Sequence, residues 1–515
     1  MKIRTKTTII LAMALLVSGP LRSQQYTENI LDGNRDIGSC SIRGSMEFDP
    51  GAQQYTLTGS GENIWFDSDQ FHFAWKKMSG DFILTADIRF IGDGHHEHRK
   101  AGWMIRGSLD TASAHVSAAV HGDGLASLQY REAEGGETLE NRSEVKSPDV
   151  IQLERRGDLF IFSAAVRGEP FRTVEVSQPA LTGEVFAGLF ICSHDNNFSE
   201  KAVFSNVRIT RPAWEGLVPY RDYLGSSLEI LDVENGHNRV VLQAPNSIQA
   251  PNWTPDGRYL VYNSEGLLYR FDIETGKSEM INSGFATSNN NDHVLSFDGK
   301  MIGISNHVAE ENNRSIIFTM PLEGGTPERI TALGPSYLHG WSPDGKWLTY
   351  TAERNGDYDI YKIALKEKNK EVRLTETPGL DDGSEYSPDG NYIYFNSART
   401  GKMKLWRMKP DGSQQEQVTF DEYNDWFPHI SPDGNWIVFL SFMPEVRADD
   451  HPFYKHVYIR RIAIPEIKTG QQDFAAGTPE VIAYLYGGQG TINVPSWSPD
   501  GKKVAFVSNS GPITD

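Results

Sequence analysis

The sequence lacks several features that would have pointed to common functions. After the first segment no apolar run approaches 18 residues, so no later part predicts a membrane-spanning helix. There is no phosphate-binding glycine loop in a strand-to-helix setting and no nucleophile elbow, which leaves nucleotide chemistry and serine hydrolysis without support. The formal net charge of −19 disfavours nucleic acid and anionic lipid surfaces as partners.

Cysteine is nearly absent, with only Cys40 and Cys192 in 515 residues. In an oxidising compartment the two could pair and staple the N-terminal domain near both of its ends. The alternative is two buried thiols, since sequence spacing does not show whether the side chains meet.

The N-terminus reads MKIRTKTTIILAMALLVSGPLRSQQ. Basic residues precede an apolar stretch, which is followed by small and polar residues, the pattern of a secretory signal peptide. We therefore expect residues 1–23 to be a signal peptide. The mature chain is expected to lack a membrane span and to be periplasmic or otherwise extracytoplasmic.

Residues 26–212 alternate between short apolar-polar stretches and turns rich in Gly, Asp and Asn. Examples are DFILTADIRFIG, KAGWMIRGSL and EVFAGLFICSH. Strands at this spacing, without a helical period between them, predict an antiparallel β-sandwich. GDFILTADI, KAGWMIR, AGLFICSHD and AVFSNVRI together resemble the concanavalin-like jelly-roll domains found beside carbohydrate-active modules, a resemblance that implies this fold and contact with sugars.

Residues 213–515 contain six repeats of one pattern, such as GWSPDGKWLTYTA and HISPDGNWIVFLS. The repeats are anchored at Trp253, Leu295, Trp341, Tyr386, Ile430 and Trp497, in steps of 42, 46, 45, 44 and 67 residues. Steps of about 40 to 50 residues, as in the first four, match one four-stranded propeller blade. In Ser-Pro-Asp-Gly, Pro presets φ, Asp suits the next position and Gly closes the turn, so the motif predicts one hairpin per blade.

Counting strands predicts an all-β chain with a six-bladed propeller. The last repeat ends after two strands, and residues 228–244 supply an unassigned pair before the first anchor. The two ends of the domain are therefore expected to share the last blade, which leaves no free sheet edge. VPSWSPDG, APNWTPDG, TAERNGD and NSARTGK resemble the TolB-like propeller family (WD40-like Pro-Asp repeats), whose members serve as scaffolds, receptors and enzymes.

Histidines concentrate on one face of the predicted propeller. We call it the mouth face, formed by the loops that lead into the inner strands and those that join the second and third strands of each blade. His293, His339 and His429 each precede an anchor, so the fold predicts that they converge at the channel mouth. Asp381, Asp382 and Glu385 come from a neighbouring blade.

Imidazoles and carboxylates from adjacent blades could bind a divalent metal such as Mn²⁺, Zn²⁺ or Ca²⁺. The metal ligands would be His293, His339 and His429, with His339, His429 and Glu385 as catalytic residues. The arrangement is similar to that of oligogalacturonate lyases, a resemblance that implies a His-rich metal site with a nearby Gln, and Gln489 lies on the same face. The alternative is that these histidines bond loop backbones or stack on Trp426 and Tyr337.

Other residues on the mouth face are candidates for ligand binding. Arg354 and Arg399 could clamp a carboxylate, or could brace neighbouring loops. The insertion 442–456 could form a lid. In the sandwich, His95, His96, Glu97 and His98 are adjacent in sequence, which makes a poor metal site and favours a solvated turn.

These features predict an exported glycan-handling protein. The mouth face would bind a saccharide, acidic or oxidised, through Asp382, Arg354, Arg399, Trp426 and Gln489, with metal-assisted lyase or hydrolase activity if the metal site forms. The alternative is a noncatalytic periplasmic scaffold of the TolB type that docks envelope proteins.

Overall fold

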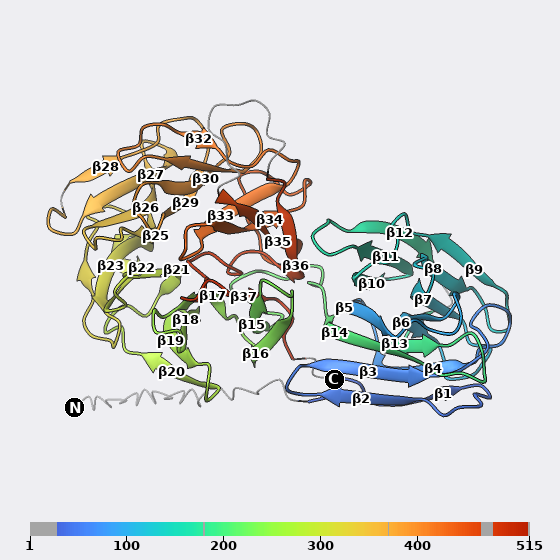
Figure 1. Ribbon diagram of the computed structural model, residues 1–515. Helices are drawn as coiled ribbons and strands as arrows, with labels where there is room; N and C mark the ends of the chain where they lie inside the picture. The colour runs from blue at the N-terminus through green and yellow to red at the C-terminus, as the bar shows by residue number, and fades with distance from the viewer. Residues whose placement is uncertain (1–27, 179–180, 369, 465–476, 513–515) are drawn as a thin grey trace, which may run out of the picture.

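A computed structural model describes residues 28–178, 181–368, 370–464 and 477–512. The expected signal peptide, residues 1–23, lies outside these ranges. The chain forms two β-rich lobes side by side, a sandwich in blue to green and a propeller in green to red (Figure 1). No helix in the described ranges has the length and hydropathy needed to cross a bilayer.

The N-terminal lobe consists of two seven-stranded antiparallel sheets. The first has the order β1 (Gly33–Ile37), β4 (Phe71–Met78), β13 (Val185–Cys192), β6 (Lys100–Arg106), β7 (His115–His121), β8 (Ala126–Arg131) and β9 (Thr138–Arg142). The second has the order β12 (Arg172–Ser177), β11 (Leu159–Ala165), β10 (Val150–Arg156), β5 (Phe82–Ile91), β14 (Glu200–Thr210), β3 (Gln54–Gly59) and β2 (Ser45–Asp49).

The strands of the sandwich alternate as the sequence pattern requires. Side chains at every second position, such as Leu84, Trp103 and Phe162, enter one core between the sheets. This confirms an all-β lobe, whereas its assignment as a concanavalin-like jelly roll stays a prediction. Cys40 and Cys192 are both free thiols, and burial raises the pKa of each, to about 12 and about 11.

The C-terminal lobe is a six-bladed propeller. Five blades have four strands each, in chain order from the inner strand outward. The first two are β17 (Gln249–Trp253), β18 (Tyr259–Ser264), β19 (Leu267–Asp272) and β20 (Lys277–Ile281), then β21 (Asn289–Leu295), β22 (Met301–Val308), β23 (Arg314–Pro321) and β24 (Glu328–Arg329). The next three are β25 (Ser336–Trp341), β26 (Trp347–Arg354), β27 (Asp357–Ala364) and β28 (Glu371–Arg373); β29 (Asp381–Tyr386), β30 (Ile393–Ser397), β31 (Lys404–Met408) and β32 (Glu416–Gln417); and β33 (Asn424–Ile430), β34 (Trp436–Phe442), β35 (Lys455–Ala463) and β36 (Glu480–Gly487). A short 3₁₀ turn, η1 (Ala309–Glu311), joins β22 to β23.

The sixth sheet draws on both ends of the lobe. Its order is β16 (Asn238–Ala244), β15 (Ser226–Asp232) and β37 (Lys503–Ser508), with Ser227 opposite Ser508 in the register. An isolated antiparallel bridge between Trp497 and Val504 of β37 joins the segment around Trp497 to this sheet.

The Ser-Pro-Asp-Gly turns hold the first two strands of their blades together. In the turn after β25, Ser342 Oγ donates to Asp344 Oδ1 at 2.7 Å, and the same carboxylate oxygen accepts from Lys346 N at 3.1 Å. Gly345 has a φ of +70°, which a residue without Cβ adopts at little cost. Ser342, Asp344 and Gly345 of the motif therefore each have a structural role in the turn.

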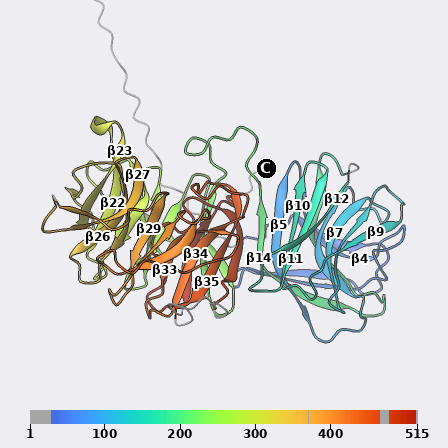
Figure 2. The same ribbon diagram turned by 90° about the horizontal axis from the view of Figure 1, so that it is seen from above.

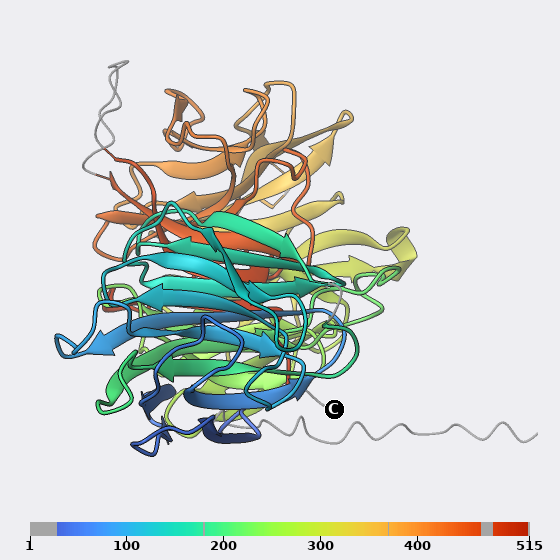
Figure 3. The ribbon, with the colours of Figure 1, turned by 90° about the vertical axis from the view of Figure 1, so that its right-hand side faces the viewer.

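The two lobes are joined through the side of the propeller. Seen from above, β14 lies on the side of the sandwich nearest the propeller (Figure 2), and the sandwich covers much of the propeller when viewed from its own side (Figure 3). Gln53 donates to the carbonyl of Val240 at 2.8 Å and accepts from Val240 N at 2.9 Å. A side chain of the sandwich thus completes the edge of β16 as a neighbouring strand would.

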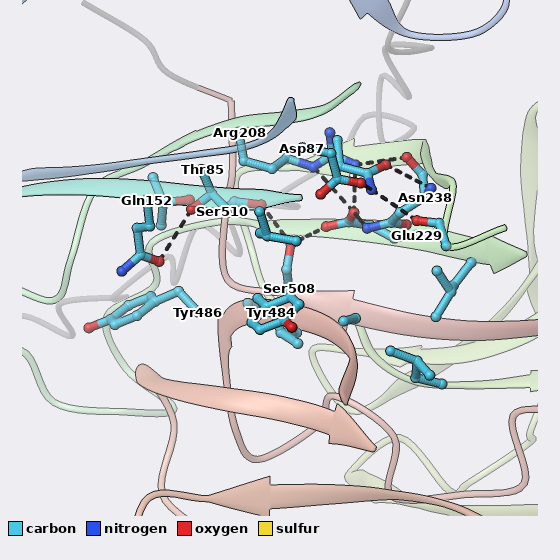
Figure 4. A pocket seen from close by; sticks show the side chains of 18 of the residues that line it. Thr85, Asp87, Gln152, Arg208, Glu229, Asn238, Tyr484, Tyr486, Ser508 and Ser510 are labelled. Carbon is cyan, nitrogen blue, oxygen red and sulfur yellow. Dashed lines mark hydrogen bonds and ion pairs between the residues drawn. The ribbon is translucent and has the colours of Figure 1, made fainter. Parts of the chain in front are cut away.

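A small cavity of about 50 Å³ lies at this junction (Figure 4). Arg208 of β14 donates to Glu229 of β15 at 2.7 Å, and Asn238 Nδ2 donates to the same carboxylate oxygen at 2.6 Å. Ser508 bonds the other oxygen of Glu229. These contacts link β14 of the sandwich to β15, β16 and β37 of the propeller, so the cavity lies at a structural joint between the lobes.

Candidate functional site

A cavity of about 660 Å³ opens on the mouth face of the propeller. Its walls come from the inner strands β21, β25, β29 and β33, from β22, β26 and β27, from the β34–β35 loop, and from the segment between β36 and β37. The lining includes Tyr220, Asn290, Asn291, Asp292, His307, Tyr337, His339, Tyr358, Asp382, Phe427, Asp449, His451 and Gln489.

Breaks in strand pairing place these side chains. The register with the neighbouring strand shifts between Asn289 and His293, between Leu338 and Gly340, between Asp382 and Glu385, and between Trp426 and His429. Such bulges bend a strand and redirect its side chains. The site is therefore built from the irregular part of four successive inner strands.

An ion pair crosses the cavity wall between two blades. His339 Nε2 of β25 lies 2.9 Å from Asp382 Oδ1 of β29. Burial disfavours the charged imidazole, but the carboxylates of Asp382 and Asp292 outweigh it and raise the pKa of His339 to about 9. Burial likewise opposes ionisation of Asp382, yet His339 and a hydrogen bond from Thr351 hold its pKa at about 2. The pair is charged at neutral pH.

Asp292 of β21 is the second buried carboxyl group of the cavity. Burial raises its pKa to about 7, assisted by the charge of Asp382 and opposed by His339. The main-chain nitrogen of Asp292 donates to Asn290 Oδ1 at 3.0 Å, which fixes the bulge that carries it. The buried Asp292 carboxyl group therefore loses its proton at a higher pH than an exposed aspartate does.

One wall of the cavity is aromatic. Part of it comes from the insertion 442–456, which the sequence predicted as a lid. Asp449 and His451 come from the loop between β34 and β35, so the insertion does reach the site. The ring of His451 stacks on Trp426, with centroids 4.5 Å apart. Trp426 is fully buried and supports the wall from behind, whereas Phe427 lines the cavity itself.

The predicted metal ligands do not form one group. His339 lines the cavity, but His293 is buried between blades, with Nε2 3.4 Å from the carbonyl of Val261. His429 Nδ1 lies 2.6 Å from Glu385 Oε2, and its Nε2 faces the carbonyl of Ile492. In the ranges that the structure describes, no three His, Cys, Asp or Glu side chains are placed to hold a metal ion.

The predicted catalytic pair His429 and Glu385 braces three blades. Glu385 also accepts from Ile430 N at 3.1 Å, and the carbonyl of His429 accepts from Trp497 Nε1 at 2.9 Å. Both ring nitrogens of His429 face protein acceptors, so neither is free to act on a substrate. Burial lowers the pKa of the third histidine, His293, to about 4.

The two candidate arginines are also occupied within the protein. Arg354 donates to Glu371 at 2.7 Å, and Arg399 donates to Asp381 at 2.9 Å. Neither lines the cavity, so these contacts support loop bracing rather than ligand clamping. Gln489 does line the cavity, where its Oε1 accepts from Asn493 at 2.9 Å.

The histidine-rich turn of the sandwich, residues 95–98, lies close to His194, which the sequence did not suggest. The His96 ring lies 4.3 Å from that of His194, and His98 lies 5.4 Å from it, on the loop after β13. His95 pairs with Asp195 at 3.1 Å. This turn lies in the sandwich, in a different lobe from the cavity.

Sequence reasoning missed most of the cavity. Asn290, Asn291 and Asp292 directly precede His293, and the polar run NNND ahead of an anchor was the available signal. Tyr337 was expected only as a stacking partner of the histidines, and Tyr358 carried no signal beyond its position on the mouth face.

Comparison with known proteins agrees with this architecture. The model of the TolB beta propeller domain matches residues 338–447. An uncharacterised protein of Agrobacterium fabrum is 46% identical over 283 residues, which are 55% of this chain and 92% of that protein. A solved structure from Agrobacterium tumefaciens described as TolB has 45% identity and a TM-score of 0.52, covering 56% of this chain and 99% of its own. The chain belongs to the TolB-like β-propeller family.

More distant members of the TolB-like family share less of their length. The Tol-Pal system protein TolB of Francisella tularensis is 29% identical over 235 residues, 43% of this chain and 52% of its own. The chain thus spans about half the length of this relative.

Proposed function

We propose that this protein is an exported, noncatalytic scaffold of the TolB type, which binds an envelope protein through the mouth face of its propeller. The observation that carries the proposal is the open cavity of about 660 Å³ at that face. Membership in the TolB-like family favours a protein partner, because a relative is named as a protein of the Tol-Pal system. Export rests on the signal-like pattern of residues 1–23.

The contacts of the expected catalytic residues support a binding role over catalysis. His429 and Glu385 bond each other at 2.6 Å and hold main-chain groups of adjacent blades. His339 is held by Asp382 as a charged pair. An imidazolium with a fixed counterion is a poor general base at neutral pH.

A saccharide is the second candidate ligand, favoured by the tyrosine-lined wall of the cavity. Tyr337 and Tyr358 have ring centroids 6.5 Å apart, and amide side chains lie beside them. The sandwich would then orient the propeller or contact polysaccharide, as the jelly-roll resemblance implies.

Site-specific photo-cross-linking in living cells tests the proposal. A benzophenone amino acid at Tyr358, which lines the cavity, is compared with the same residue at Lys346, exposed in a turn on the opposite face. We expect a defined protein adduct from position 358 only. Glycan adducts at 358, or the same protein adducts from both positions, would contradict the scaffold proposal.

A further inference from the structure

We propose that the mouth-face cavity receives a positively charged side chain, lysine or arginine, presented by an exposed segment of the protein partner. This inference rests on the proposed function, because it names the chemistry of the group that the same cavity takes. It also departs from the acidic saccharide expected from the sequence.

The carboxyl groups of the cavity are not all neutralised within the protein. Asp382 is paired with His339 at 2.9 Å, and Asp449 is paired with Arg447 at 2.7 Å. Asp292 is only 6% exposed and forms no salt bridge with any residue that the structure describes. The cavity therefore has one carboxyl group whose charge a ligand can balance.

The two remaining histidines of the cavity, His451 and His307, contact other groups and form no salt bridge with Asp292 among the described residues. The ring of His451 stacks on Trp426, and burial lowers its pKa, so it is uncharged at neutral pH. His307 Nδ1 lies 3.0 Å from the carbonyl of Asn313, within its own loop. An anionic sugar would meet the buried Asp292 carboxyl group without a free cation beside it, which is unfavourable.

The aromatic wall suits a cation as well. Tyr337 and Tyr358 lie with ring centroids 6.5 Å apart and planes at 37°, and Phe427 lines the same space. The faces of such rings attract ammonium and guanidinium groups. A long side chain with an apolar stem and a charged end would use both the rings and Asp292.

A second buried group points to the main chain of the partner. Asn291 lines the cavity, is 3% exposed, and its Nδ2 has no hydrogen-bond partner. A buried donor without an acceptor is unfavourable, and a ligand carbonyl would accept its hydrogen bond. An extended peptide can supply that carbonyl together with a basic side chain, whereas a bare metal ion cannot.

Titration of the full chain with small probes tests the charge requirement. Nα-acetyl-L-arginine amide and Nα-acetyl-L-lysine amide are compared with Nα-acetyl-L-citrulline amide, a neutral analogue of the arginine probe, and with D-galacturonate, by ligand-observed NMR at pH 8. At least one basic probe is expected to bind the protein at least fivefold more tightly than citrulline or galacturonate. Asp292→Asn should remove that preference, and Asp67→Asn, at an exposed site in the sandwich, should preserve it.

Binding of citrulline as tight as that of both basic probes, tighter binding of galacturonate, or an unchanged preference in Asp292→Asn would overturn the inference. The thermal midpoint of each variant checks that it folds. Failure here with the position-358 protein adduct intact leaves the scaffold proposal standing. If the adduct at position 358 is lost while the preference for the basic probe remains, the scaffold proposal is contradicted and the charge preference of the cavity stands.

Discussion

His339 of β25 and Asp382 of β29 form an ion pair of 2.9 Å that joins two blades at the wall of the mouth-face cavity. Removing one member leaves the other charge buried without a partner, which costs about 3 kcal/mol. We expect His339→Gln to lower the free energy of unfolding by that amount at pH 7, measured by urea denaturation. The double variant His339→Gln/Asp382→Asn should lose less unfolding free energy than the sum of the losses in the two single variants. A loss equal to that sum would show that the two residues are not coupled.

The same pair predicts a stability plateau with two edges. The pKa of Asp382 falls from 3.8 to about 2 on folding, so its contribution is lost as the pH drops through that range. The pKa of His339 rises from 6.5 to about 9, so its contribution is lost as the pH climbs through that range. The difference in unfolding free energy between wild type and the double variant should be largest between about pH 4 and pH 6.5, and a difference independent of pH would contradict the pairing.

The charge of Asp292 should lower the stability of the fold, whereas the charges of His339 and Asp382 raise it. Its pKa rises from 3.8 to about 7 on folding, so ionisation destabilises the fold increasingly as the pH rises between these values. Asp292→Asn should therefore stabilise the protein by up to about 3 to 4 kcal/mol at pH 8 and change little at pH 3.5. Charged or titratable groups that face Asp292 are His339, Asp382, Tyr337 and Tyr220. Equal stabilisation at both pH values would show that ionisation of Asp292 is not the cause.

Glu385 should matter for stability and not for binding. Glu385→Gln replaces one of the two carboxylate oxygens that accept from Ile430 N and face His429, at a cost of about 2 kcal/mol. Urea denaturation should show that loss, while the affinity for Nα-acetyl-L-arginine amide stays within twofold of wild type. A stable variant with weakened probe binding would instead assign Glu385 to the site.

Arg208 should couple the two lobes. Arg208→Ala leaves Glu229 buried at the junction without its cation, and we expect a loss of about 3 kcal/mol together with a broader calorimetric transition. Arg447→Ala, in an exposed pair at the surface, should cost less than about 1 kcal/mol. Matching losses in the two variants would mean that the junction contributes no more than a surface contact.

The sequence predicted the architecture because the propeller is encoded locally and repeatedly. Each Ser-Pro-Asp-Gly turn is defined by four adjacent residues, so its role at Ser342 to Gly345 could be derived without knowing the rest of the chain. The face on which His339 lies followed from the same count of strands.

The site itself depended on side-chain direction, which sequence spacing does not determine at a bulge. Asp292 lines the cavity while the next residue, His293, is buried between blades. His429 is displaced from Phe427 by a shift in pairing and bonds Glu385 instead of facing the channel. One residue of register reverses the direction of every side chain, so histidines near the mouth in sequence did not all reach it.

The bond of Gln53 to Val240 has a practical consequence for anyone dividing this chain. A propeller produced alone would display the bare edge of β16, with main-chain donors and acceptors ready to pair with another copy. Self-association of such a fragment would then result from the loss of the sandwich lobe. It would not identify the partner of the intact protein.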